Sequence, residues 1–304
     1  MSTTEPRARP DAVGGLLVAT ASLLFGSVVI FGKFGLRQGL PVPSLLAARY
    51  AVGAVVLAVA LLVLRRPLLP VRGERAALAG LGVFLYALES GLFFSALQYG
   101  TAAAVTLLFF TYPVFVTVAT WVLGQGRPSR LTMLALACAV LGAGLVVGTG
   151  GGLAIEKIGV LFALGSAVAY TVYLIGADRV LRRTNPLTSA MWVSAGASLG
   201  LSAYAIVTGV AQVPSGWSEW WPVLGMGGAT AGAFVCLMSG LQRIGPVRTS
   251  IVAATEPLAA AFLGFVFLDE SVQLGTVLGG ALILVGAVTA SLARTVTAPE
   301  QQIP

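Results

Sequence analysis

Residues 97–113, LQYGTAAAVTLLFFTYP, return 144 positions later as residues 241–257, LQRIGPVRTSIVAATEP. Each stretch ends on a proline, Pro113 in the first copy and Pro257 in the second. The same register holds without a gap over residues 96–290. A single match between apolar segments means little, because Leu, Ala and Gly are abundant. One register that keeps both prolines in place indicates an internal duplication.

The composition is that of a membrane protein. Hydrophobic residues make up 57% of the chain, charged residues 10%, and the mean hydropathy is +0.94, whereas a soluble domain carries about 25% charged residues. About 20 apolar residues cross the hydrocarbon core as a helix. Ten such stretches occur, at Gly14–Leu36, Pro43–Leu64, Arg75–Leu97, Thr101–Leu123, Leu131–Gly148, Ile158–Ala177, Leu187–Val207, Trp217–Gln242, Val247–Leu268 and Val272–Ala293.

The basic residues predict an orientation. Fourteen arginines fall in one set of loops and termini, and the opposite set holds only Lys33, Arg37 and Lys157. The positive-inside rule then places both termini in the cytoplasm and the chain in the inner (plasma) membrane. Each half has five spans, an odd number, so the halves face opposite ways. Inverted repeats of this kind are the architecture of alternating-access transporters.

The predicted fold is an all-α integral membrane protein, with ten transmembrane helices in two inverted five-helix repeats around a central cavity. We expect a cytoplasmic N-terminal tail at 1–13, a first repeat at 14–148, a linker at 149–157, a second repeat at 158–293 and a cytoplasmic C-terminal tail at 294–304.

The sequence lacks the residue patterns that several classes of chemistry require. The chain has no histidine, and its two cysteines, Cys138 and Cys236, lie inside apolar runs without a metal-ligand partner. The glycine run 148–152 lacks the lysine and the strand-to-helix context of a phosphate loop. We therefore expect no metal, no cofactor, no enzyme activity and no drive by ATP. The net charge of +7 reflects loop topology and predicts no nucleic-acid partner.

Motifs in the second half point to a family. Glu256-Pro257, Leu268-Asp269-Glu270 and the run GGALILVG at 279–286 occur there, and AARY at 47–50 starts the second span. This pattern resembles the EamA type of the drug/metabolite transporter superfamily over nearly the whole chain. The first half departs from it, because Gln125-Gly126 stands where the second half has Asp269-Glu270.

That resemblance implies a secondary transporter that exports, or less often imports, a small metabolite across the bilayer. Amino acids, especially aromatic and apolar ones, are a prominent substrate class in the family. Drugs, sugars, carboxylates and nucleotide conjugates stay open as alternatives. The chain is expected to act as a monomer or a homodimer. An intramembrane enzyme on lipid-linked substrates, a scaffold and a channel are rival classes.

Three ionisable residues lie inside spans, where a charge is costly and by default marks a site. Arg49 lies about 9 Å deep and Glu89 about 12 Å deep on the same side, by helical rise. We expect them to form an ion pair or to share one polar pocket. The alternative for Arg49 is that it reaches the headgroups. Tyr86 and Phe93 share the helix face of Glu89.

Glu256 lies about 13 Å from the nearer end of its span and precedes Pro257. A mid-helix proline frees a carbonyl and kinks the helix, so Pro113 and Pro257 are predicted hinges. Glu256 is a candidate for solute or proton binding. The alternative is that it only caps polar groups near Thr255 and Gln242. Glu89, Arg49 and Glu256 are the candidates for proton coupling.

Further candidate cavity residues come from the repeat. Tyr112 stands at the position that Glu256 occupies in the other half. Ser22 lies on a stripe of the first span, whose shifted counterpart in the sixth span carries Tyr170 and Tyr173. These tyrosines suit stacking on an aromatic or amphipathic solute. Plain helix packing explains them nearly as well. Gln242 completes the predicted cavity set.

Overall fold

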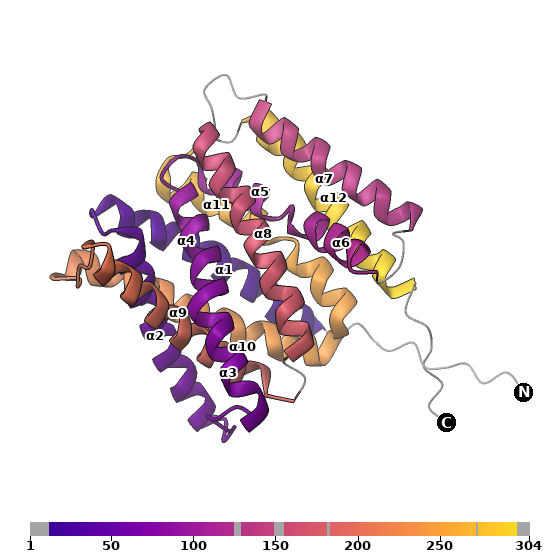
Figure 1. The fold of residues 1–304 in the computed structure, drawn as a ribbon. Helices are drawn as coiled ribbons and strands as arrows, with labels where there is room; N and C mark the ends of the chain where they lie inside the picture. Colours follow the sequence, from indigo (N-terminus) through magenta and orange to yellow (C-terminus); the bar gives the residue numbers. More distant parts are fainter. Residues whose placement is uncertain (1–11, 125–128, 149–154, 181–182, 272, 297–304) are drawn as a thin grey trace, which may run out of the picture.

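The protein is almost entirely helical in the computed structural model, which describes residues 12–124, 129–148, 155–180, 183–271 and 273–296. Figure 1 shows the helices packed into one bundle. Within the described residues, the only β feature is a single antiparallel bridge between Gly100 and Ile155. The ends of the predicted tails and residues 149–154 of the predicted linker lie outside the described part of the chain.

The first half contains one helix for each predicted span, although two spans are divided. Its elements are α1 (Ala12–Arg37), α2 (Val42–Val63), a 3-10 turn η1 (Arg72–Glu74), α3 (Arg75–Gly80), a π-helical turn η2 (Leu81–Tyr86), α4 (Ala87–Ala96), α5 (Ala102–Phe109), α6 (Tyr112–Val122) and α7 (Arg130–Gly148).

The second half follows the same order with fewer breaks. Its elements are α8 (Lys157–Val180), α9 (Pro186–Val207), α10 (Trp217–Ala253), α11 (Glu256–Leu268) and α12 (Leu274–Val296).

The described helices account for the ten predicted spans. Among the described residues, seven helical stretches are long and apolar enough to cross a membrane. Three shorter apolar stretches supply the fifth, ninth and tenth spans, at Met133–Val146, Glu256–Leu268 and Leu274–Gly286. The all-α fold class predicted from the sequence is therefore confirmed.

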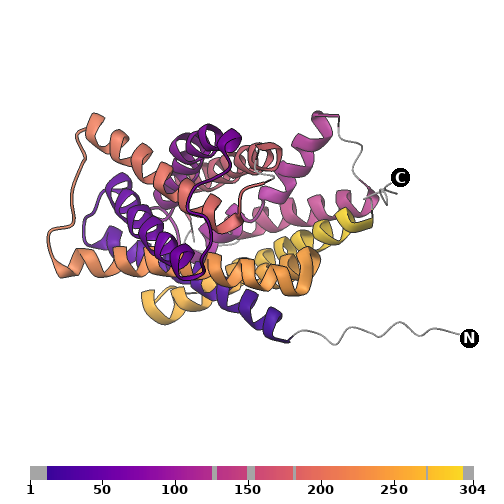
Figure 2. The ribbon, with the colours of Figure 1, turned by 90° about the horizontal axis from the view of Figure 1, so that it is seen from below.

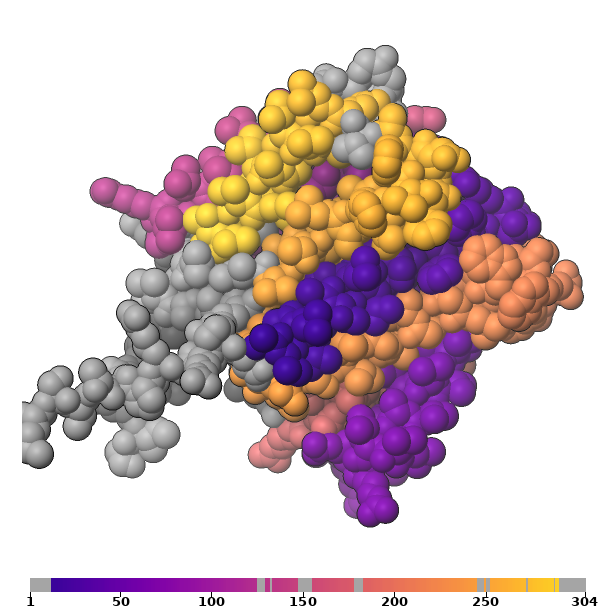
Figure 3. Space-filling model, turned by 180° about the vertical axis from the view of Figure 1, so that it is seen from behind, coloured from indigo at the N-terminus to yellow at the C-terminus, as the bar shows by residue number. Residues whose placement is uncertain are grey.

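Contacts between the halves follow a pseudo-two-fold relation. Helix α1 packs on α10 and α11, and its counterpart α8 packs on α4 and on α5 and α6. Helix α2 packs on its own counterpart α9, and α7 packs on its own counterpart α12. Figure 2 shows α7 and α12 side by side at the edge of the bundle, and Figure 3 shows α1 in indigo between orange segments of the second half. The centre of the molecule thus lies between the two halves.

One predicted boundary is wrong. A loop was expected between Gln242 and Val247, but α10 continues through this stretch to Ala253. The expectation rested on Gly245 and Pro246. A proline inside a membrane helix removes one hydrogen bond, yet neighbouring helices allow the helix to continue. The corresponding stretch of the first half does break, because α4 ends at Ala96 and α5 starts at Ala102.

Both predicted hinge prolines start new helices at equivalent positions. Pro113 lies in the first turn of α6, and Pro257 lies in the first turn of α11. The threonine before each helix makes the same bond, because Thr111 Oγ1 donates to Leu108 O and Thr255 Oγ1 donates to Val252 O, both at 2.7 Å. Spans four and nine are therefore broken at mid-length in the same way.

The π-helical turn η2 is held by a close contact with α9. A Cβ added at Gly82 would lie 2.6 Å from Val193 O, and one added at Gly200 would meet the carbonyl of Val83. Only glycine permits this approach. Single π turns often occur next to functional sites, and this one ends at Tyr86, three residues before Glu89.

Candidate functional site

A cavity of about 290 Å³ lies between the two halves. Side chains from α1, α2, α4, α5, α6, α8, α10 and α11 face it, together with residues at the two broken spans. Most of them are apolar or aromatic. The lining consists of Phe25, Val28, Val29, Arg49, Tyr86, Glu89, Ser90, Phe93, Phe94, Phe109, Phe110, Tyr112, Pro113, Tyr170, Phe234, Leu237, Ala253, Ala254 and Glu256.

All three intramembrane charged residues predicted from the sequence line this cavity. Arg49 on α2 is 6% exposed, so the alternative in which it reaches the headgroups does not describe this structure. Its Nη2 donates to Thr230 Oγ1 at 3.2 Å, and its Nε has no hydrogen-bond partner. The guanidinium carbon lies 4.6 Å from the ring centre of Tyr50 and 5.2 Å from that of Phe94.

Glu89 shares the cavity with Arg49 without forming an ion pair with it. Glu89 is 6% exposed and accepts a hydrogen bond from Ser90 Oγ at 3.2 Å. Ser90 in turn shares a hydrogen bond with the Tyr50 hydroxyl. No described carboxylate lies within 4.0 Å of the Arg49 nitrogens. Of the two arrangements predicted for this pair, the structure has the shared pocket.

Glu256 is the first residue of α11 and faces the cavity beside Ala253 and Ala254. The structure does not have the capping arrangement that was the alternative, because Thr255 bonds to Val252 O and the Gln242 side chain is exposed. The broken ninth span thus points a carboxyl group into the space between the halves.

Seven aromatic side chains form a nearly closed collar at the cavity. Successive ring centres lie 5.1 to 5.8 Å apart. Arg49 closes the collar by lying over both of its ends. In order, the aromatic collar consists of Tyr50, Tyr86, Tyr173, Tyr170, Phe109, Phe93 and Phe94. Tyr112 packs edge-on against Tyr170 from α6, with ring centres 4.9 Å apart.

The predicted site residues fall into three groups. Glu89, Tyr86, Phe93, Tyr112, Tyr170, Glu256 and Arg49 line the central cavity. Tyr173 belongs to the collar and, with Tyr86, lines a second cavity of about 210 Å³ beside the start of α9. Ser22 and Gln242 are not in either lining: Ser22 is buried and donates to Val18 O, and Gln242 is exposed on α10.

Tyr170 and its repeat counterpart Gly26 show how the halves diverge. A Cβ added at Gly26 would lie 2.9 Å from Ala260 N, so α1 approaches α11 closely. At the matching place in the other half, the Tyr170 ring stands between α8 and the α5–α6 segment. The wider, aromatic side of the cavity therefore lies along α8.

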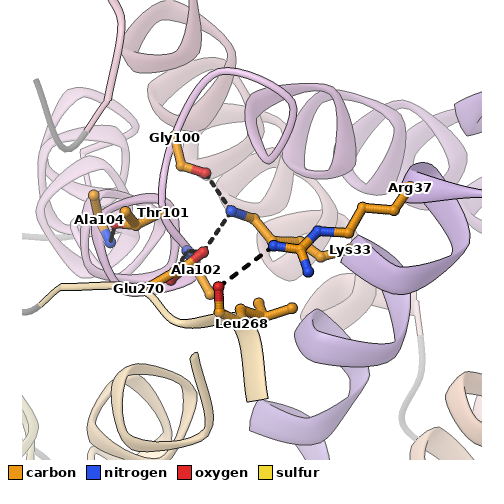
Figure 4. Close-up of polar contacts among 8 residues, drawn as sticks. All are labelled: Lys33, Arg37, Gly100, Thr101, Ala102, Ala104, Leu268 and Glu270. Carbon is orange, nitrogen blue, oxygen red and sulfur yellow. Dashed lines mark hydrogen bonds and ion pairs between the residues drawn. The ribbon is translucent and has the colours of Figure 1, made fainter. Parts of the chain in front are cut away.

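An ion pair links the two halves at one end of the bundle. Lys33 Nζ lies 2.6 Å from Glu270 Oε1 and donates to Gly100 O at 2.7 Å. Glu270 also accepts from Ala102 N, with its Oε2 at 2.8 Å (Figure 4). We call Lys33, Gly100, Ala102 and Glu270 the Lys33 cluster. Arg37 adds a bond to Leu268 O at 3.4 Å.

The Lys33 cluster lies beyond the cavity along several helices. Lys33 is one helical turn past the cavity residue Val29 on α1. Ala102 is seven residues before Phe109 on α5, or about 10 Å by helical rise. These contacts lie at the bundle end where α1, α4 and α11 terminate.

Sequence reasoning did not assign the Lys33 cluster a role. Lys33 was assigned to the set of loops with few basic residues and Glu270 to a family motif, but 237 residues separate them. Phe109, which contacts Phe93 and Tyr170, was also missed. Its position four residues before Pro113 in a broken span was the available signal. Among the described residues, no group of three His, Cys, Asp or Glu side chains could hold a metal ion.

The similarity to a known family covers each of the two repeats separately. A sequence model of the EamA-like transporter family matches residues 12–148 and again residues 157–292. An uncharacterized transporter of Archaeoglobus fulgidus is 28% identical over 70% of this chain and 75% of its own length. The uncharacterized transporter YcbK of Bacillus subtilis is 25% identical over 90% of this chain and 91% of its own.

Further similarities extend to a bacterial inner membrane protein and to a solved fold. An uncharacterized inner membrane transporter of Salmonella typhimurium, YicL, is 26% identical over 66% of this chain and 67% of its own. A protein crystal structure superposes with a TM-score of 0.64 and 21% identity, covering 94% of this chain and 99% of that one. This last similarity concerns the fold alone.

Proposed function

Because this chain belongs to the EamA-like transporter family, we propose that it is a secondary transporter that exports amino acids, with aromatic and apolar ones favoured, or related metabolites. It is a multi-pass membrane protein of a transporter family. We place it in the inner membrane with both termini in the cytoplasm, by the distribution of its arginines.

The convergence of Arg49, Glu89 and Glu256 on one cavity carries this proposal. These three side chains come from different helices and from both repeats, and each is costly to hold inside a membrane. They share the cavity with the aromatic collar, which supplies apolar surface for a solute. An amino acid with an aromatic or apolar side chain offers both kinds of group at once.

The size of the cavity agrees with a single small solute. Ligand pockets span about 300 to 1,000 Å³, and this cavity, at about 290 Å³, is near the lower limit. A nucleotide conjugate would exceed it. The second cavity beside Thr184, Ser189 and Ser194 adds about 210 Å³ on the far side of Tyr86.

In the proposed orientation the Lys33 cluster faces the outside. Its ion pair then closes the outer end, and the solute enters the cavity from the cytoplasmic side. Release outward requires Lys33 and Glu270 to separate, with the hinges at Pro113 and Pro257 absorbing the change. This sequence is alternating access around a fixed site, which sets it apart from a channel.

The energy source is either the solute gradient alone or a proton gradient. Glu89 and Glu256 are the groups that could carry a proton, since both line the cavity and neither forms an ion pair with a described residue. A pH gradient across the membrane separates the two cases: a proton-coupled carrier accumulates solute against its gradient, and a uniporter does not.

Counterflow in reconstituted vesicles tests the proposal. Proteoliposomes loaded with unlabelled phenylalanine, leucine, glucose or an organic cation are each diluted into the same solute in labelled form, with and without a pH gradient. We expect saturable counterflow of the amino acids that exceeds that of protein-free vesicles. Counterflow of glucose or the cation without any amino acid flux contradicts the substrate assignment. Non-saturable flux without counterflow identifies a channel.

A further inference from the structure

Arg49 is a buried cation without an anion. It is 6% exposed, it faces the cavity, and no described carboxylate lies within 4.0 Å of its nitrogens. Within the described residues, its one hydrogen bond runs from Nη2 to Thr230 Oγ1 at 3.2 Å. Its Nε is buried and has no partner.

Such an arrangement is costly unless something else completes it. Buried charges in proteins are normally paired, because desolvation of an unpaired ion is expensive. The rings of Tyr50 and Phe94 stabilise the cation through their π faces. They do not satisfy N–H donors in the guanidinium plane. The guanidinium is planar, and its N–H donors fit a carboxylate with two parallel hydrogen bonds.

We infer that Arg49 binds the carboxylate of the transported solute, with the rest of the solute against the aromatic collar. This inference rests on the proposed function and narrows its substrate class to carboxylate-bearing molecules with an aromatic or apolar body. Phe93, Phe94 and Phe109 provide the apolar surface next to the guanidinium. Arg49 is thereby the residue that determines specificity for an acid over the matching amine or amide.

Glu89 is not the missing anion in this structure. Its carboxylate accepts from Ser90 Oγ at 3.2 Å, and Ser90 is tied to Tyr50. This chain of hydrogen bonds holds Glu89 in the cavity wall while Arg49 remains unpaired. Glu89 and Glu256 instead supply negative groups to the same cavity, which suits the ammonium group of an amino acid.

Direct binding to the purified full-length protein tests this role without requiring transport. The probes are 3-phenylpropionate, phenylalanine, phenylalaninamide and phenethylamine, measured by titration calorimetry in detergent. We expect the two carboxylate-bearing probes to bind at least tenfold more tightly than phenylalaninamide. R49Q should weaken both by at least tenfold and leave phenethylamine unchanged. Equal affinity for acid and amide, or no binding of any probe, overturns the inference.

Matched variants separate recognition from folding. R49K keeps the charge but loses the planar fork, so it should give an intermediate loss for 3-phenylpropionate. T230V removes the acceptor of Nη2 and should weaken binding two- to fivefold through loss of positioning. E89Q removes a negative charge from the cavity, so it should bind 3-phenylpropionate at least as tightly as the wild type does. A loss in E89Q equal to that in R49Q would assign Arg49 to an ion pair with Glu89 and overturn the inference.

The exposed Arg130, at the start of α7, provides a control. R130Q should bind all four probes as the wild type does. If R49Q does not fold, as judged by size-exclusion chromatography and thermal unfolding, R49K and T230V decide the question. Acid-selective binding without counterflow contradicts the proposed function and supports the anion site at Arg49. Counterflow of phenylalanine and phenylalaninamide at equal rates supports the proposed function and contradicts the anion site.

Discussion

The central cavity and the Lys33 cluster differ in whether their charged side chains form ion pairs. In the Lys33 cluster, the Lys33 ammonium and the Glu270 carboxylate lie 2.6 Å apart, and each has a backbone partner as well. In the cavity, Arg49 and Glu89 are buried and Glu256 is half-buried, and none of the three forms an ion pair with a described residue. A paired charge stabilises one conformation of the protein. An unpaired buried charge lowers the stability of the fold but is available to bind a ligand.

The largest expected effect comes from the carboxyl groups of the cavity. E89Q and E256Q should each lower counterflow at least tenfold, because the amide keeps the shape but removes the negative charge. Thermal unfolding should occur at the wild-type temperature or above it, since a buried charge is removed from a site of low dielectric. Counterflow assays and unfolding scans on the same preparations measure both.

E156Q serves as the control for these variants, because Glu156 is an exposed glutamate just before α8. It should change neither quantity. Native counterflow in both E89Q and E256Q would show that the cavity carboxyl groups do not act in transport. Lower stability in both would place their main role in the fold.

Breaking the Lys33 cluster should have an intermediate effect with the opposite signature. K33E and E270K each put like charges at a distance of a few ångströms, so both transport and unfolding temperature should fall, transport by about three- to tenfold. The double variant K33E/E270K restores the attraction. Coupling energies for groups in contact are about 0.5 to 3 kcal/mol, so the double-mutant cycle should show this much recovery.

K157Q changes an exposed lysine at the same end of the bundle and should behave as the wild type. Additive losses in the double variant would mean that the ion pair contributes nothing to closure. Recovery of stability without recovery of transport would make the Lys33 cluster a structural contact only.

The smallest effect is expected from moving Glu270 without removing it. A Cβ added at Gly264 would lie 2.7 Å from Glu270 Oε2. The carboxylate is the flexible end of its side chain, so G264A should displace it at moderate cost and lower the unfolding temperature by a few degrees. G228A is the matched control, since a Cβ there meets nothing within 4 Å. Equal unfolding temperatures of the two variants would contradict a tight contact at Glu270.

Much of this architecture follows from sequence patterns. The 144-residue register placed two helix breaks at equivalent positions, because Pro113 and Pro257 both start helices after equivalent threonines. Helical rise alone put Arg49 and Glu89 at one depth, and they share a cavity. These inferences depend on positions along single helices, which a sequence defines well.

The failures all depend on which helices meet. Gln242 was assigned to the cavity, but α10 continues past it and its side chain is exposed outside the cavity lining. The pairing of Lys33 with Glu270 needs α1 beside α11, and the π turn at η2 needs the glycine face of α9. Neither contact leaves a periodic signal in the chain.

The mid-span position of Arg49, Glu89 and Glu256 has an electrical consequence. Moving one elementary charge through 100 mV is worth about 2.3 kcal/mol. In alternating access the barrier shifts from one side of these groups to the other, while the groups themselves stay in place. The membrane potential then acts on the net charge of the solute. A zwitterion crosses without electrical work, whereas an inside-negative potential drives a solute with only a carboxylate outward.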